Sequence, residues 1–345
     1  MKKQTATISK SLSDLFSLPT IDLMDRLDVM LSQEDRPHYV TKDYFNVLSS
    51  NQRSHSSRSN AKQVTPAARA KIVRWLYDIV DYFNLERSTV AMAMRYVDRF
   101  VSSPNARAAR RGVTSYQLAC LSCLFLAIKT MDVSHLDVDM LVKASRGCYD
   151  RQEILDMERE VLDALGWRVC DATSSCISNH LMGLLIKVLP MDVSDVDSLV
   201  DFTRFQIELS VVEYPLSVLR RPSTVALAAV LNSMELLGFN SSQKAVYHRV
   251  IQSIGLSLAS TKVRETSHEL NEMCDRQSED ITSRMSALSI AHHTTDSETE
   301  VTPLPLPRKK NAIKCQPSPT CVVKVPSSSS KNRHRRSGEN VRERR

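Results

Sequence analysis

The sequence predicts an all-α protein, from its scarcity of glycine, its apolar content and the spacing of its apolar residues. Only 7 of the 345 residues are glycine, far below the usual share of about 7%. Tight turns between strands need glycine at positive φ, so this scarcity favours helices joined by short polar loops. Apolar residues make up 42% and charged residues 25% of the chain, which is typical of a soluble globular protein with a packed core.

The N-terminal segment, residues 1–63, is expected to hold one short helix and a polar linker. Residues 1–19 are expected to be disordered. The stretch "IDLMDRLDVMLSQEDRPHYV" then predicts an amphipathic helix that carries Leu23, Leu27 and Met30 on one face and ends before Pro37. The polar linker is "SNQRSHSSRSNAKQ", residues 50–63.

A first group of five helices is predicted over residues 64–168. Thr65 can cap the first helix and Pro66 can begin it, and apolar residues then keep a helical spacing to about Asn84. The third helix is apolar nearly all round, so the other helices must surround it. The four helices after the first are "RSTVAMAMRYVDRFVSS", "TSYQLACLSCLFLAIKT", "DVDMLVKASRG" and "DRQEILDMEREVLDALG".

A second group of five helices is predicted over residues 169–280, beginning near Thr173. Its third segment is again the most apolar one. The chain therefore repeats one architecture of about 100 residues with almost no residue identity between the copies. The segments are "SCISNHLMGLLIKVL", "DVSDVDSLVDFTRFQIELSVVE", "PSTVALAAVLNSMELLG", "SSQKAVYHRVIQSIG" and "SLASTKVRETSHELNEMCD".

Residues 281–345 are expected to form a disordered basic tail, because helical periodicity ends near Ile281. From Arg308 to Arg345 there are 12 Lys and Arg against 2 acids, which leaves 34 basic and 37 acidic residues, a net of −3, in the first 307. The basic pI therefore gives no argument that the folded part binds nucleic acid. The stretch between His293 and Arg308 has the composition of a PEST-type degradation signal, or of a solvated linker. The basic clusters favour the nucleus, with the cytoplasm as a further location.

The sequence contains no constellation that indicates an enzyme, a metal or a cofactor. A glycine-rich phosphate loop, a metal-binding histidine pair and paired carboxylates in a pKa-shifting context are all missing from it. Cys120 and Cys123 form a single CxxC inside a predicted helix, which is weak evidence for metal or redox chemistry. They are interpreted, with Cys170 and Cys176, as small buried thiols. No window of about 18 uncharged apolar residues predicts a membrane span.

Two pairs of charged residues fall where the helical pattern predicts burial or half-burial. Arg69 lies in the first turn of the first helix of its group, and Asp98 lies among apolar residues of the second. Buried charges persist mainly when paired, so we predict an internal Arg69–Asp98 bridge that fixes how these helices cross. Lys129 ends the third helix, where the helix dipole alone would favour a cation. Glu158 lies amid apolar residues of the fifth helix.

Four stretches, "ARAKIVRWL", "YVDRF", "QLACLSCLFLAIK" and "ILDMEREVL", resemble the cyclin box. The second group resembles the C-terminal cyclin fold, so the likeness covers roughly residues 20 to 275. It is specific because six signature positions agree together with the 29-residue step between the last two. The matching residues are Arg69, Asp98, Leu118, Ala127, Lys129 and Glu158.

The resemblance implies two tandem five-helix cyclin folds in a protein without catalysis or cofactor, which binds and activates a cyclin-dependent protein kinase in cell-cycle control. It also implies that Lys129 and Glu158 bond to the backbone of the kinase helix that carries its glutamate switch. We expect the two residues side by side on an outward, mostly apolar surface, unpartnered until the kinase arrives. The alternative is an intramolecular salt bridge.

The first helix departs from the family pattern. Ile72 and Trp75 mark a docking patch for kinase substrates or inhibitors, but Lys71 and Arg74 place charge where the patch would be apolar. Two other classes of protein remain as alternatives. One is a transcription protein that resembles the B-type initiation factor, although this sequence has no zinc ribbon before its repeats, and the other is an interaction scaffold without a kinase.

Overall fold

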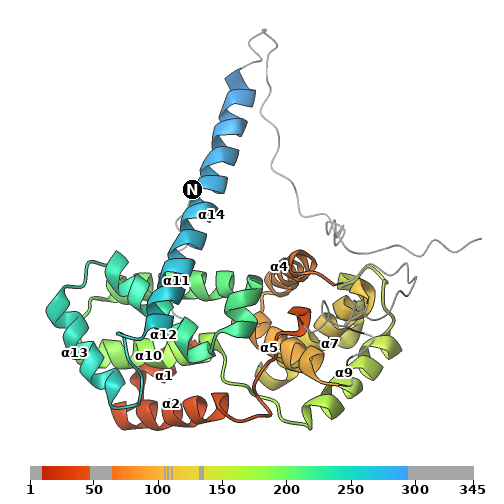
Figure 1. The fold of residues 1–345 in the computed structure, drawn as a ribbon. Helices are drawn as coiled ribbons and strands as arrows, with labels where there is room; N and C mark the ends of the chain where they lie inside the picture. Colours follow the sequence, from red (N-terminus) through yellow and green to blue (C-terminus); the bar gives the residue numbers. More distant parts are fainter. Residues whose placement is uncertain are drawn as a thin grey trace, which may run out of the picture.

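The computed structural model describes residues 10–46, 64–104, 106, 109, 112–131 and 136–293, with side chains to residue 277. All regular elements in these ranges are helices, arranged as two bundles side by side (Figure 1). The helices are α1 (Lys10–Ser17), α2 (Thr20–Glu34), α4 (Pro66–Tyr82), α5 (Ser88–Ser102), α7 (Val113–Met131), α8 (Val138–Ala144), α9 (Arg151–Leu165), α10 (Ser174–Val188), α11 (Val193–Val212), α12 (Pro222–Leu236), α13 (Ser241–Gln252), α14 (Thr261–His293) and a π-helical turn, η2 (Pro215–Leu219).

The first bundle is built around α7. Every residue from 119 to 128 of this helix is buried, and α5 and α9 pack against it. By length and composition α7 is apolar enough to cross a membrane, but two-thirds of that stretch is buried inside the protein, as in the core helix of a soluble bundle. The predicted helix starts are present as caps, since Thr65 Oγ1 accepts from Ala68 N and Asp150 forms a capping box with Glu153.

The second bundle is built around α12, which packs against α10, α11 and α14. Helices α1 and α2 belong to this bundle, because Leu12, Leu23 and Leu27 are buried in its apolar cluster. Gly183 of α10 permits this packing. A Cβ atom on Gly183 would lie 3.2 Å from Leu23 Cδ1, so a larger residue would require the Leu23 side chain to shift.

Two sequence predictions about the ends of the folded region are wrong. Residues 10–17 form α1 rather than disordered chain, because Leu12 gains burial against the second bundle and tertiary packing stabilises a helix too short to persist alone. Helix α14 continues to His293, past the predicted end near residue 281. The linker at 50–63, the PEST-like stretch and the basic clusters lie outside the described residues.

The end of α2 is bonded to α12 and to the connection between the bundles through side-chain hydrogen bonds. The Glu34 carboxylate accepts from Ser223 N at 2.7 Å and from Ser223 Oγ at 2.8 Å, which satisfies the first turn of α12. Gln33 Oε1 accepts from Ala172 N at 2.6 Å, in the connection between the bundles. Burial raises the pKa of Glu34, while the bonds from Ser223 oppose that rise.

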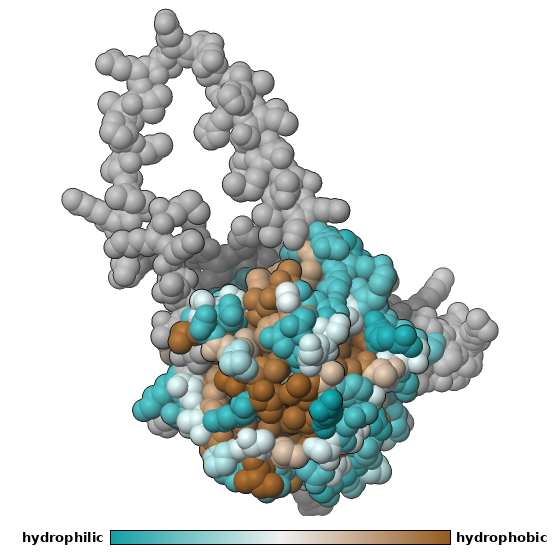
Figure 2. All heavy atoms as spheres, turned by 90° about the vertical axis from the view of Figure 1, so that its left-hand side faces the viewer, coloured by the Kyte–Doolittle hydropathy of each residue, from teal (hydrophilic) through white to brown (hydrophobic). Residues whose placement is uncertain are grey.

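One end of the molecule carries an apolar surface. Figure 2 shows apolar side chains gathered at the centre of the face that lies at the left of Figure 1, where α13 is found. The elements at this end carry exposed apolar residues, including Leu236 at the end of α12 and Val246 in α13.

Replacing Glu34 with alanine should destabilise the protein by about 1–3 kcal/mol, because the Ser223 amide loses its acceptor in a buried site. Glu34→Gln keeps one acceptor oxygen and should cost less. Urea unfolding of the two variants measures the difference. Equal losses for alanine and glutamine would show that the cap contributes nothing.

The stability of the protein should fall as the pH drops through the unfolded-state pKa of histidine, because of His180. Its Nδ1–H donates to the Cys176 carbonyl at 2.8 Å, and burial, aided by the charge of Arg26, lowers its pKa from 6.5. The folded state therefore binds the proton less tightly than the unfolded state, and the contribution is present above about pH 6.5 and lost on acidification. Urea unfolding at pH 7.5 and 5.5 should show a smaller loss for His180→Gln than for wild type, with the exposed His268→Gln as control.

Candidate functional site

The structure brings Arg69 and Asp98 together at the centre of the molecule. Arg69 lies in the first turn of α4 and Asp98 in α5, and both side chains are 0% exposed. Arg69 Nη2 lies 2.8 Å from Asp98 Oδ2, and Arg69 Nε lies 3.3 Å from Oδ1. This two-bond geometry fixes both side chains, as is typical of a buried arginine–carboxylate pair.

The remaining atoms of this pair bond to distant parts of the chain. Arg69 Nη1 donates to the Val211 carbonyl at 2.8 Å, and Nη2 donates to Ser217 Oγ at 2.8 Å. Tyr44 OH donates to Asp98 Oδ1 at 2.9 Å. The pair therefore joins the first bundle to the end of α11 and to the N-terminal segment, which is a structural role.

A second buried charge cluster, which the sequence analysis missed, lies at the connection between the bundles. Arg99 Nη1 lies 2.5 Å from Asp171 Oδ1, and Arg95 Nε lies 3.7 Å from Oδ2. Burial lowers the pKa of Arg95 and raises that of Asp171, although the two guanidinium groups oppose the second shift. The available signal was the four-residue spacing of Arg95 and Arg99 on a helix that is otherwise buried.

Lys129 and Glu158 also lie together. Lys129 ends α7, Glu158 occupies the middle of α9, and Lys129 Nζ contacts Glu158 Oε1 directly. The Lys129 side chain is 44% exposed and that of Glu158 is 8% exposed. Lys129 Nζ also lies 4.3 Å from the centre of the Phe125 ring, a favourable cation–π position.

The expectation that these two groups stay unpartnered is wrong. Each neutralises the other within the chain, because a lysine at the end of one helix reaches a carboxylate on the helix beside it, and a nearly buried carboxylate without a counter-charge would be costly. The ammonium group still has two donors beyond the one that faces Glu158.

Apolar side chains flank the Lys129–Glu158 pair. Leu155 and Leu162 stand three and four residues from Glu158 on α9, so they lie one turn away on either side, and both are half-buried. Phe125 packs beneath the ammonium group. Lys129 offers a donor and Glu158 an acceptor, and both are surrounded by apolar side chains. This arrangement suits recognition of main-chain groups rather than catalysis.

The docking patch predicted at Ile72 and Trp75 is not exposed. Ile72 is fully buried in the first core and Trp75 is nearly so. The outer face of α4 at this point is formed by the exposed Lys71 and Arg74, because the apolar stripe of the helix turns inward to the core.

The cysteines offer little chemistry. Cys120 and Cys123 are buried free thiols, and burial raises the pKa of both, which makes them inert. Cys170 differs from the prediction, because it is exposed. The described residues contain no group of three or more metal-ligating side chains.

Removing one member of the buried pair should be severe. Asp98→Ala leaves the Arg69 guanidinium buried without its counter-charge and should cost about 3–5 kcal/mol, whereas Arg69→Met with Asp98→Leu together should cost less than the sum of the single changes. Urea unfolding checks this. Arg151→Met, at an exposed ion pair on α9, should leave stability unchanged, and additive single costs at residues 69 and 98 would contradict the interpretation.

Comparisons with known proteins agree with this architecture. A family model described as cyclin, N-terminal domain, matches residues 39–170. Cyclin-A1-2 of Oryza sativa subsp. japonica is 27% identical over 170 residues, which cover 49% of this chain and 34% of that protein. Putative cyclin-A3-1 of Arabidopsis thaliana is 27% identical over 237 residues, covering 67% and 64%. G2/mitotic-specific cyclin-2 of Antirrhinum majus is 25% identical over 187 residues, covering 54% and 40%.

The matches therefore span only about one-third to two-thirds of these relatives' own lengths. Among solved structures, a viral cyclin from herpesvirus saimiri is similar with a TM-score of 0.50 and 16% identity, over 67% of this chain and 98% of that one, a likeness of fold. Together with the six signature positions, these findings identify the family. Residues 39–170 therefore belong to the cyclin family, whose members are non-catalytic regulatory subunits.

Proposed function

We propose that this protein binds a cyclin-dependent protein kinase and favours its active conformation. The observation that carries the proposal is the Lys129–Glu158 pair on the first bundle, where a donor and an acceptor from two helices stand beside Leu155 and Leu162. Both residues lie at signature positions of the family. The apolar neighbours would supply most of the affinity and the charged pair would set the register of the kinase helix.

The contact between Lys129 and Glu158 does not block this role. The ammonium group of the half-exposed Lys129 has donors that do not face Glu158, so a partner can bond to it while Glu158 keeps its counter-charge. The pair also holds both groups in place before the kinase arrives, which reduces the entropy lost on binding. An incoming main-chain carbonyl would accept from Lys129, and a main-chain N–H would donate to Glu158.

The proposed effect on the kinase is a population shift rather than chemistry. A partner that binds the active conformation more tightly than the inactive one raises the active fraction by that difference in affinity. The kinase itself would supply the phosphoryl transfer.

Cell-cycle control and a nuclear location are part of the same proposal. One relative is named as specific to G2 and mitosis, and basic residues cluster from Arg308 to Arg345. Kinase substrates or inhibitors are further expected partners. A fluorescent fusion of the full chain should concentrate in the nucleus, and removing residues 308–345 should spread it into the cytoplasm. An unchanged distribution would contradict the role of these residues.

Retention of a kinase from a lysate tests the proposed contact at Lys129 and Glu158. Purified wild-type protein should retain a cyclin-dependent kinase from a lysate, identified by mass spectrometry, and Lys129→Ala or Glu158→Ala should reduce retention about tenfold or more, as expected for a charged contact worth about 1.5–3 kcal/mol. The matched control is an interhelical lysine–glutamate pair of the second bundle, Lys244 and Glu235, joined at 3.1 Å. Equal retention of the kinase by the wild type and by the Lys129 and Glu158 variants would contradict the proposed contact.

A charge exchange separates partner binding from internal stability. The double variant Lys129→Glu with Glu158→Lys keeps an attractive pair within the chain but exchanges donor and acceptor as the kinase meets them. We expect near-wild-type thermal stability together with loss of kinase retention. If the exchanged protein retains the kinase, the pair is only an internal salt bridge and the chain acts through other surfaces.

A further inference from the structure

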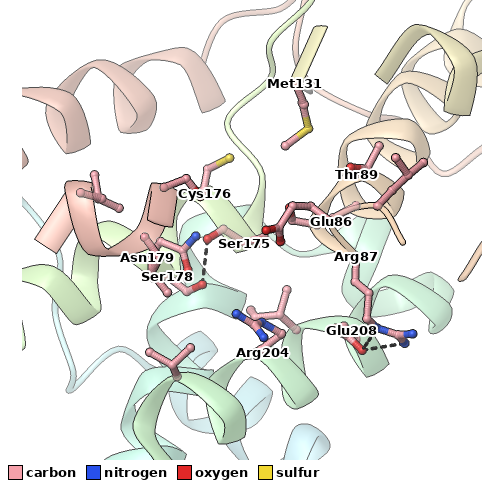
Figure 3. Close-up of a pocket in the computed structure, with 18 of the residues that line it drawn as sticks. Glu86, Arg87, Thr89, Met131, Ser175, Cys176, Ser178, Asn179, Arg204 and Glu208 are labelled. Atoms are coloured by element: carbon pink, nitrogen blue, oxygen red, sulfur yellow. Dashed lines mark hydrogen bonds and ion pairs between the residues drawn. The ribbon is translucent and has the colours of Figure 1, made fainter. Parts of the chain in front are cut away.

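A cleft lies between the two bundles, on the side where α7 ends. Its volume is about 820 Å³, within the range of about 300–1,000 Å³ that ligand sites occupy. Several parts of the chain line it: α1, the connection from α4 to α5 with the first turn of α5, the end of α7, the first turns of α10, and the middle of α11. Figure 3 shows side chains from these parts turned toward one another around the opening.

The two walls carry opposite charges. Glu86 extends from the α4–α5 connection and Arg204 from α11 (Figure 3), and both are exposed. Neither has an ion-pair partner within the described part of the chain. The other two charged residues of these walls neutralise each other, since Arg87 Nη2 lies 2.8 Å from Glu208 Oε2. The cleft therefore presents one available anion and one available cation, on opposite sides.

Uncharged polar groups of the cleft lining suit a polypeptide backbone. Thr89 lines the cleft, is almost completely buried, and its Oγ1 has no hydrogen-bond partner in the described structure, so it can donate to a carbonyl oxygen. His180 donates through Nδ1 to the Cys176 carbonyl, which leaves Nε2 of the neutral ring as an acceptor for an N–H group.

Apolar side chains complete the lining. Leu15 and Leu85 are half-buried at the cleft, and Met131 is 37% exposed there. They give room for an apolar side chain between the charged walls. This combination of separated opposite charges, single backbone-type donors and acceptors, and an apolar interior differs from the neighbourhood of Lys129, which holds one contiguous ion pair.

We propose that this cleft binds an extended peptide of a partner protein, in which an apolar residue stands between a basic residue that meets Glu86 and an acidic residue that meets Arg204. Charge complementarity selects this occupant, because a peptide with one sign of charge would be repelled by one wall. The proposal does not depend on kinase binding, since the cleft residues are separate from Lys129 and Glu158.

The probe is a phage-displayed library of random eight-residue peptides, selected against the full chain. Enriched peptides, synthesised with fluorescein, are then measured by fluorescence anisotropy. We expect the enriched set to carry an apolar residue between opposite charges. Glu86→Lys or Arg204→Glu should each weaken binding about tenfold or more, and the double reversal should bind the same peptide with its two charges exchanged. Both residues are exposed, so thermal unfolding should be unchanged.

Three outcomes would overturn the proposal. The first is a library without enrichment. The second is an enriched set of peptides whose affinities are unchanged by Glu86→Lys and by Arg204→Glu, as they are by the remote control, Lys244→Glu with Glu235→Lys. The third concerns residues 1–9, which continue from α1 at the cleft. If deleting them strengthens peptide binding more than tenfold, the chain's own N-terminal segment is the occupant. Kinase retention by the same variants should remain at the wild-type level, so failure here is distinct from failure of the kinase proposal.

Discussion

The buried pair of Arg69 and Asp98 is the constraint on which the arrangement of this protein depends. Removing two charges from water costs several kcal/mol for each ion, and the pair meets that cost by saturating its hydrogen bonds rather than by attraction alone. Arg69 bonds to the Val211 carbonyl, and Asp98 accepts from Tyr44. Because these partners come from the end of α11 and from the N-terminal segment, the pair is satisfied only when both bundles are docked. A displaced bundle would leave the buried Arg69 Nη1 without its acceptor, the Val211 carbonyl.

The cluster of Arg99 and Asp171 is a second buried ion pair, and it lies at the connection between the bundles. Asp171 lies where the chain leaves the first bundle, and Arg99 also donates to the Arg168 carbonyl at 2.9 Å. Two neighbouring residues of α5 therefore bond to other parts of the chain: Arg99 to Asp171 in the connection, and Asp98 to Ser217 Oγ at 3.2 Å. The walls of the cleft beside the end of α7 belong to bundles that these buried charges join.

Much of the helical architecture could be predicted from the sequence, because periodicity and capping act over a few residues. The sequence also predicted that Arg69 and Asp98 are partners, because each is a charged residue on an apolar helix face. Their other partners, Tyr44 and Ser217, could not be predicted, because nothing in the local sequence records which distant segments meet. Helix α1 was missed for the same reason, as its stability comes from contact with the second bundle. The spacing of Lys129 and Glu158 predicted that they meet, but not that they neutralise each other.

The Arg69–Asp98 and Lys129–Glu158 pairs differ in exposure, and that difference separates their roles. Arg69 and Asp98 are completely shielded, so no outside group can replace either one without unfolding the core. Lys129 keeps almost half of its side chain in water, and the Glu158 side chain beside it is 8% exposed, so a partner can add bonds at this pair without breaking the fold. A carboxylate that is nearly buried also gains more from an incoming N–H group than an exposed one would, because the surrounding medium screens it less. The buried Arg69–Asp98 pair therefore stabilises the fold, whereas the partly exposed Lys129–Glu158 pair remains accessible to a partner.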